Sequence, residues 1–263
     1  MTDLPLQAMA FAQTLALEAA SMVQQAARQS NAVEFKSPGD WCSAVDRRIE
    51  AHLRARIAQA YPQHGFLGEE SATTRVTPGL LWVVDPLDGS MNFLRGYPQY
   101  SVSIALLSDA EPIAACIADP CRQEFFCAAA GHGAHLQGAR LRVAATARMD
   151  EAIAATVFPK PQSAHLPHYL AQFGRVVAAA AGVRRSGSMA LELAYLAAGR
   201  VDVFWSHGMG SWDAAAGVLL IREAGGQVFT LDGARWCDSP SLAAAAPGVA
   251  DAWHALLQPH TRA

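Results

Sequence analysis

The residues best placed to do chemistry lie where an apolar run, Leu81–Val84, ends in Asp85 and Asp88. Pro86 fixes a turn between the two aspartates, so both carboxylates and the backbone carbonyl of Leu87 can converge on one cation. An all-oxygen donor set of this kind favours Mg²⁺ or Mn²⁺. The alternative is an ordinary Asp-Pro turn in which a side chain caps the backbone.

The next two residues, Gly89 and Ser90, form a candidate binding place for phosphate. They lead into a helical turn, and backbone N–H groups at the start of such a turn can hold a phosphate dianion. Phosphate ester hydrolysis needs such a combination, because divalent ions neutralise the dianion, lower the pKa of water and stabilise the leaving alkoxide. The sequence has no motif for a covalent enzyme intermediate, which favours direct attack by metal-activated water.

Two other acidic sites are candidate metal ligands only in combination with this turn. Glu69 and Glu70 follow a short apolar run, and alone they are more typical of a solvated turn. Asp213 follows Ser211 at the start of an apolar helix, 214–220, where an N-cap and a first-turn acid explain the same residues equally well. Both sites are therefore candidates that depend on where the fold places them.

The elements that must position these residues begin with two helices. Apolar residues recur at helical spacing over 6–29 and again over 45–57. Ser43 and Asp46 form a capping pair at the start of the second helix, and Pro62 ends it. We expect the first helix to cover the core.

The segment between the two helices, 30–41, is rich in turn formers and predicts a mobile loop. This loop carries Lys36, whose ammonium group could screen the phosphate or support a metal site. A lysine in such a loop is more often simply solvated, which is the alternative here.

Beyond the second helix, short apolar runs rich in β-branched and aromatic residues predict an antiparallel sheet. Its predicted strands are 81–84, 100–107, 112–118, 123–129 and 140–143, with a turn at 130–137. After about residue 150, strand and helix alternate, at 153–158, 165–173, 188–198, 201–205, 211–224 and 227–230. We expect a single domain in which an α+β half, residues 1–145, carries most metal ligands and an α/β half, residues 146–263, carries Asp213 and the substrate side.

Composition narrows the functional classes. Of the 263 residues, 52% are hydrophobic and 16% charged, which indicates a globular protein. A formal net charge of −3 and the absence of a long Lys/Arg run argue against a nucleic-acid partner. The sequence has no apolar stretch long enough to cross a bilayer, no secretory signal and no C-x-x-C pair, so we expect a cytoplasmic protein without a membrane partner.

Three segments resemble the signatures of the inositol monophosphatase family, in that family's order and spacing. They are GEES at 68–71, WVVDPLDGSMNF at 82–93 and WDAAAG at 212–217, which EAGG follows at 223–226. Weaker family-like segments, KSPGD at 36–40, AVD at 44–46 and GSMALELAYLAAGRVDVFW at 187–205, extend the resemblance over nearly the whole chain. The resemblance implies a layered αβαβα sandwich, lithium-sensitive hydrolysis of a small phosphorylated alcohol, and a homodimer.

Carried over position by position, the resemblance implies two or three Mg²⁺ ions, with Mn²⁺ as a substitute. Their implied ligands are Glu69, Asp85, the Leu87 carbonyl, Asp88 and Asp213, and Glu69 would also hold the attacking water.

The resemblance also implies catalytic parts for two hydrogen-bonding residues. Ser90 stands where the family usually has threonine, and its hydroxyl, paired with Asp46, would take part in activating the water. Serine lacks the methyl group that restricts rotation, so this pairing is expected to be less ordered. For Asp46, the capping box with Ser43 is the alternative explanation.

On the substrate side the resemblance implies Ser188, Met189, Ser206 and Asp213. Ser206 stands where inositol-selective enzymes usually place a glutamate that accepts hydrogen bonds from ring hydroxyls, and Met189 occupies a position that is usually small. Unpaired polyol hydroxyls cost about 1–3 kcal/mol each, so these departures weaken the case for inositol itself.

Several substrates stay open within the expected reaction class. An inositol-1-phosphate-like ester leads, with histidinol phosphate and 3′-phosphoadenosine 5′-phosphate as alternatives. Arg184 and Arg185 are candidates for gripping a second anionic group, although a pair of surface arginines is the simpler explanation. From another class, a non-catalytic ligand-binding relative is the alternative.

Overall fold

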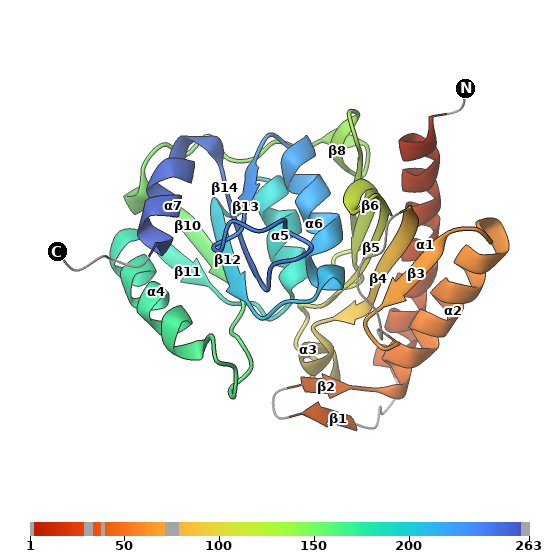
Figure 1. The fold of residues 1–263 in the computed structure, drawn as a ribbon. Coiled ribbons are helices and arrows are strands. Elements are labelled where there is room, and N and C mark those ends of the chain that lie inside the picture. The colour runs from red at the N-terminus through yellow and green to blue at the C-terminus, as the bar shows by residue number, and fades with distance from the viewer. Residues whose placement is uncertain (1–2, 29–33, 38–39, 72–78, 259–263) are drawn as a thin grey trace.

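Two large sheets and three layers of helices alternate in this protein, and a small two-stranded sheet lies beside them (Figure 1). The computed structural model describes residues 3–28, 34–37, 40–71 and 79–258, with the backbone alone for 34–37 and 40–42. Helices lie outside the first sheet, between the two sheets and outside the second sheet. This order confirms the αβαβα sandwich that the family resemblance implied.

The first sheet has seven strands and stands against two long helices. In spatial order the strands are β3 Gly65–Gly68, β4 Leu80–Asp88, β5 Ser101–Ser108, β6 Glu111–Asp119, β7 Glu124–Ala129, β8 Gly133–Leu136 and β9 Ala139–Arg140, antiparallel except for the β3–β4 pair. Helices α1 Leu4–Ala27 and α2 Ala44–Ala60 pack on its outer face. The helix predicted over 6–29 is therefore α1, which starts two residues earlier because Asp3 caps it and Pro5 occupies its first turn.

The middle layer consists of α5 Met189–Ala197 and α6 Ser211–Glu223. Both helices are buried almost all round, as expected for helices that face a sheet on each side. They approach closely because Gly217 has no side chain: a Cβ there would lie 2.5 Å from Leu193. This contact fixes the start of each helix, where the site residues lie.

The second sheet has five strands in the order β11 Gly182–Arg184, β10 Ile153–Thr156, β12 Val203–His207, β14 Ser241–Ala245 and β13 Gln227–Phe229. Strands β11, β10 and β12 are parallel, so their carboxyl ends meet at one edge. Helices α4 Leu166–Ala179 and α7 Ala250–Leu257 cover the outer face. The remaining elements are β1 Glu34–Ser37, β2 Asp40–Cys42, α3 Ser90–Leu94 and two 3₁₀ turns, η1 Met149–Glu151 and η2 Pro247–Val249.

Some predicted segments were wrong. The turn predicted at 130–137 contains β8, because Gly131 and Gly133, both at positive φ, complete the turn early enough for a strand to follow. The strand predicted at 140–143 is only β9, which ends at Arg140. Within the predicted loop at 30–41 the backbone forms β1 and the start of β2, and the rest of that segment lies outside the described residues.

No helix in the described ranges combines the length and apolar character needed to span a bilayer.

Candidate active site

Three aspartates from two layers of the fold meet at one point. Asp85 and Asp88 lie at the end of β4, and Asp213 lies in the first turn of α6. One carboxylate oxygen from each lies within 4.8 Å of the other two. Asp85 is 1% exposed and Asp88 8% exposed, so the negative charges are concentrated away from water.

A β-bulge explains how two residues of one strand reach the same point. Side chains alternate along a strand, so Asp85 and Asp88, three positions apart, would point to opposite faces. The β4–β5 register shifts between them: Asp85 pairs with Ser103 and Asp88 with Ser101, which are only two positions apart. The one extra residue on β4 turns both carboxylates to the same face, toward α6.

Protein donors fix one oxygen of Asp85 and one of Asp213. Asp85 Oδ1 accepts a hydrogen bond from the Leu87 N–H at 2.9 Å. Asp213 Oδ2 accepts from the Gly210 N–H at 2.6 Å, in the manner of a capping box. The second oxygen of each carboxylate thus keeps its lone pairs for another ligand.

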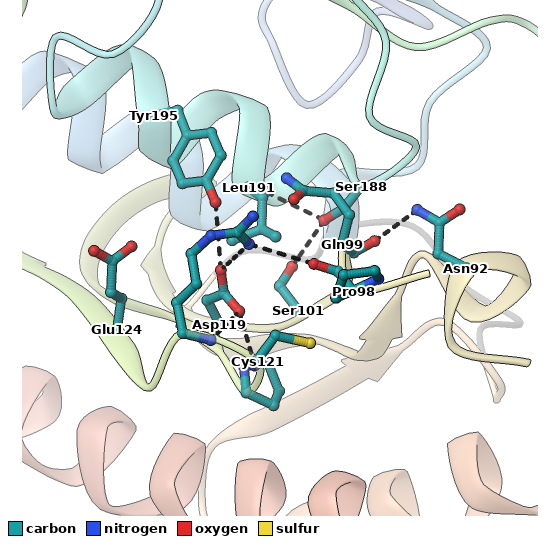
Figure 2. A network of polar contacts seen from close by, with 12 residues as sticks. Asn92, Pro98, Gln99, Ser101, Asp119, Cys121, Glu124, Ser188, Leu191 and Tyr195 are labelled. Atoms are coloured by element: carbon teal, nitrogen blue, oxygen red, sulfur yellow. Dashed lines mark hydrogen bonds and ion pairs between the residues drawn. The ribbon is translucent and has the colours of Figure 1, made fainter. Parts of the chain in front are cut away.

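Asp88 is held in the same way by the start of α5. Its Oδ2 accepts hydrogen bonds from Ser188 Oγ at 2.5 Å and from the Ala190 N–H at 2.8 Å. Ser101 Oγ lies 3.1 Å from Ser188 Oγ, and the two hydroxyls face each other in the close view of this region (Figure 2). Ser188 is fully buried, so the structure places it as a support for Asp88, behind the pocket wall.

A second polar network ties the first sheet to α5 close to these contacts (Figure 2). Buried Asp119, at the end of β6, accepts hydrogen bonds from the backbone N–H groups of Cys121 and Arg122 at 2.9 and 3.0 Å. The guanidinium of Arg122 at 2.9 Å and the hydroxyl of Tyr195 on α5 at 3.3 Å complete its shell. This network holds α5 against the sheet and so steadies the support of Asp88.

The electrostatics of the cluster favour bound protons or a bound cation. Burial raises the pKa of Asp85 well above its usual range, and the charges of Glu69, Asp88 and Asp213 raise it further. Burial, followed by the charges of Asp88 and Glu69, does the same to the pKa of Asp213. A divalent ion would remove this repulsion, and the all-oxygen donor set fits Mg²⁺ or Mn²⁺.

Glu69 lines the same pocket but lies outside the group of three oxygens. It follows β3, and its N–H donates to the Val84 carbonyl at 3.2 Å. The buried carboxylate of Glu50 accepts from the next N–H, that of Glu70, at 2.7 Å. The end of β3 is therefore held on both sides of Glu69.

Ser90 and Asp46 are in direct contact across two elements. Ser90 Oγ lies 2.5 Å from Asp46 Oδ1 and 2.8 Å from the Leu87 carbonyl oxygen. Asp46 Oδ2 accepts from both the N–H and the hydroxyl of Ser43, each at 2.7 Å, as a capping box for α2. The sequence posed these contacts as alternatives, and the structure contains both.

Gly89 occupies the turn between β4 and α3 with a φ of +89°, a left-handed conformation that favours glycine. A Cβ at this position would lie 3.0 Å from the Gln99 carbonyl oxygen and 3.2 Å from that of Gly187. The backbone itself is thus brought against the pocket wall, which also contains Gly187 and Ser90.

Gly89→Ala is expected to lower the free energy of unfolding by about 1–3 kcal/mol, because alanine adds left-handed strain and two close backbone contacts. Denaturant titration measures this loss. Gly233→Ala is the matched control, because Gly233 also has a positive φ, +74°, but has open space around it. Equal losses in both variants would show that close packing at Gly89 contributes nothing.

The cluster opens into a pocket of about 210 Å³. Apart from Met91 of α3, the pocket residues beyond the carboxylates and the Gly89 turn come from the strand ends of the second sheet, the segments that follow them and the start of α5. They are Val157, Phe158, Pro159, Lys160, Arg185, Gly187, Met189, His207, Gly208 and Met209.

Two of the predicted substrate contacts, Met189 and Ser206, have different places relative to this wall. Met189 lines the pocket, but Ser206 is fully buried behind it, and its hydroxyl donates to Met189 Sδ at 3.7 Å. A direct contact between Ser206 and substrate does not fit this geometry, because side chains alternate along β12 and the next residue, His207, takes the pocket side. Lys36 lies in β1, and its side chain is outside the described part of the structure.

Sequence reasoning missed Phe158, Lys160 and His207. His207 ends β12, and the other two follow the end of β10, the neighbouring parallel strand. The rule that binding residues gather at the carboxyl ends of parallel strands could have found them. Of the two arginines, Arg185 lines the pocket, whereas Arg184 lines a separate cavity.

Comparisons with known proteins agree on one family. The sequence pattern described as "Inositol monophosphatase family" matches residues 6–262. An inositol-1-monophosphatase of Rhizobium meliloti is 43% identical over 199 residues, covering 75% of each chain. The Nus factor SuhB of Pseudomonas aeruginosa is also 43% identical, over 206 residues and 76% of each chain.

Solved structures give the same result. The extragenic suppressor protein SuhB of Bartonella henselae superposes with a TM-score of 0.87 at 34% identity, covering 94% of this chain and 96% of that one. The inositol monophosphatase of an Anabaena species superposes with a TM-score of 0.83 at 31% identity, covering 96% and 95%.

Proposed function

Because the chain belongs to the inositol monophosphatase family, we propose that it hydrolyses a small, inositol-1-phosphate-like phosphate monoester with the help of Mg²⁺. One observation carries the proposal: three clustered carboxylates, two of them buried, each have one oxygen fixed by protein donors and another left for a common cation. Their proposed fellow ligands are Glu69 and the Leu87 carbonyl, and Mn²⁺ is the expected substitute ion.

When bound, two or three divalent ions would neutralise the phosphate dianion, lower the pKa of water and stabilise the leaving alkoxide. The protein's own groups do the positioning. Glu69 orients the attacking water, and the N–H groups at Gly89 and Ser90 hold the phosphate. Because the Ser90 hydroxyl donates to Asp46, its oxygen can present a lone pair to the proton of that water.

On the alcohol side we propose Met189 and Asp213 as contacts, with Ser188 acting through Asp88. We further propose that lithium inhibits the enzyme and that the protein is a cytoplasmic homodimer. We also propose that the enzyme works without nucleic acid, because its net charge is −3 and the name Nus factor describes relatives, not this chain.

The proposal is tested by phosphate release from inositol 1-phosphate, histidinol phosphate and 3′-phosphoadenosine 5′-phosphate. We expect turnover of at least one ester with kcat/KM of about 10⁴ M⁻¹s⁻¹ or more in Mg²⁺, and none in EDTA. Millimolar lithium should lower the rate. Tight binding of an ester by calorimetry in Mg²⁺ with no phosphate release would instead identify a ligand-binding relative.

A further inference from the structure

The pocket that the aspartates line also carries two exposed cations, Lys160 and Arg185. Lys160 follows β10 and Arg185 follows β11, its parallel neighbour, so the topology brings both to the same edge of the second sheet. His207 ends β12 on the other side of β10 and also lines the pocket. Residues from three adjacent parallel strands therefore form this wall.

An aromatic ring holds Arg185 in place. Its guanidinium carbon lies 5.0 Å from the centre of the Phe158 ring, a cation–π contact. Phe158 in turn packs edge-on against Tyr169 and Phe173, with ring centres 5.5 and 6.1 Å apart. Among the described residues no carboxylate forms an ion pair with Arg185, so its five N–H donors are not committed to an acid.

Other arginines of the chain do pair with acids. Arg200 binds both oxygens of Glu124, at 2.6 and 2.5 Å, and Arg122 binds Asp119 at 2.9 Å. Arg185 differs from both in lining the pocket of the aspartates, where it lies over the Phe158 ring.

The backbone places Arg185 near the proposed phosphate turn. Gly187 lies against Gly89, since a Cβ on Gly89 would be 3.2 Å from the Gly187 carbonyl oxygen. A Cβ on Gly187 would in turn be 3.3 Å from Arg185 Nη1. One small substrate can therefore touch the phosphate turn and the guanidinium at once.

The same wall offers few acceptors for polyol hydroxyls. The buried Ser206 replaces the expected glutamate, and the carboxylates that line the pocket are those of the metal end. Burial, with a smaller effect of His168 and His165, lowers the pKa of His207 to about 4, so this ring is neutral near pH 7. Lys160 and Arg185 thus supply the positive charge on the part of the pocket proposed to face the alcohol part of the substrate.

We propose that Lys160 and Arg185 bind a second anionic group, so that the preferred substrate is a phosphate monoester whose alcohol part carries a further phosphate or carboxylate. This inference rests on the proposed phosphatase function. The ester phosphate lies with the metal ions, and the second anion lies against the guanidinium and ammonium groups that line the same pocket.

The test compares matched esters of α,ω-diols with three to six carbons: the monophosphate, the bisphosphate and the phosphate whose other end is a carboxylate. We expect kcat/KM to be about 10- to 100-fold higher for at least one doubly anionic ester than for its monophosphate, as one or two charge-assisted hydrogen bonds provide. The bisphosphate and carboxylate arms identify which anion the wall prefers.

Arg185→Gln and Lys160→Gln should each lower this preference about tenfold, mainly through KM. Arg184→Gln, the adjacent arginine on another cavity, should leave the preference unchanged. Equal rates for singly and doubly anionic esters, or a preference that survives both pocket variants, would overturn the inference while leaving the phosphatase proposal intact. Failure to hydrolyse any ester, inositol 1-phosphate included, would overturn both the inference and the phosphatase proposal.

Discussion

Asp85→Asn is expected to lower kcat/KM for the best phosphate ester by about 10³-fold, which corresponds to about 4 kcal/mol of lost transition-state stabilisation. Asparagine keeps the size of the side chain and an oxygen that can accept from the Leu87 N–H, but it lacks the negative charge that binds a divalent ion. Phosphate release at saturating and limiting Mg²⁺ measures the loss. Asp251→Asn, an exposed residue in the first turn of α7, is the matched control and should retain full activity.

The same substitution is expected to affect stability in the opposite direction. Because the pKa of Asp85 is raised in the folded protein, its ionised form destabilises the metal-free state, and the stabilising effect of the protonated form is lost as pH rises. Metal-free Asp85→Asn should therefore melt no lower than the metal-free parent at pH 8. The parent should gain thermal stability on adding Mg²⁺, and the variant should gain little. A variant that is both inactive and less stable than the metal-free parent would point to misfolding instead.

Ser90→Ala is expected to lower kcat by about 10²-fold, the usual contribution of a positioned proton-transfer group. The Ser90 hydroxyl lies between Asp46 and the Leu87 carbonyl, and alanine removes both contacts. Ser90→Thr should keep activity within about threefold of the parent, since it retains the hydroxyl and restricts its rotation. Steady-state rates in Mg²⁺ give the comparison.

Ser43→Ala separates the two contacts of Asp46. It removes the hydroxyl of the capping box and should cost about 1 kcal/mol of stability. The contact between Asp46 and Ser90 survives, so kcat should stay close to the parent value. An unchanged kcat for Ser90→Ala would assign Asp46 to the helix cap alone. A large fall in kcat for Ser43→Ala would contradict the separation of the two contacts.

Local signals in the sequence predicted the acidic turn and the helix start that carries Asp213, whereas the layered fold was predicted from the family resemblance. A strand that ends in Asp85, Pro86 and Asp88 marks a turn at a sheet edge, and Ser211 to Asp213 mark a helix start. Bringing these two points together requires the packing of α6 against the first sheet, and here the family resemblance supplied what local pattern could not.

Other features depend on non-local geometry and were missed. The bulge that turns Asp85 and Asp88 to one face appears only in the pairing with β5. The place of Ser206 behind the pocket wall and of His207 in its lining depends on which face of β12 meets the pocket. Lys160 gave no signal in the sequence, because it belongs to no motif and is brought to the pocket by the order of parallel strands.

Diffraction from a crystal soaked in Mn²⁺ tests the central claim most directly, since manganese scatters anomalously and replaces Mg²⁺ in oxygen sites. The account predicts an anomalous peak at about 2.1–2.2 Å from carboxylate oxygens of Asp85, Asp88 and Asp213. An active enzyme whose manganese peaks all lie elsewhere, with the three aspartates free of metal, would contradict it.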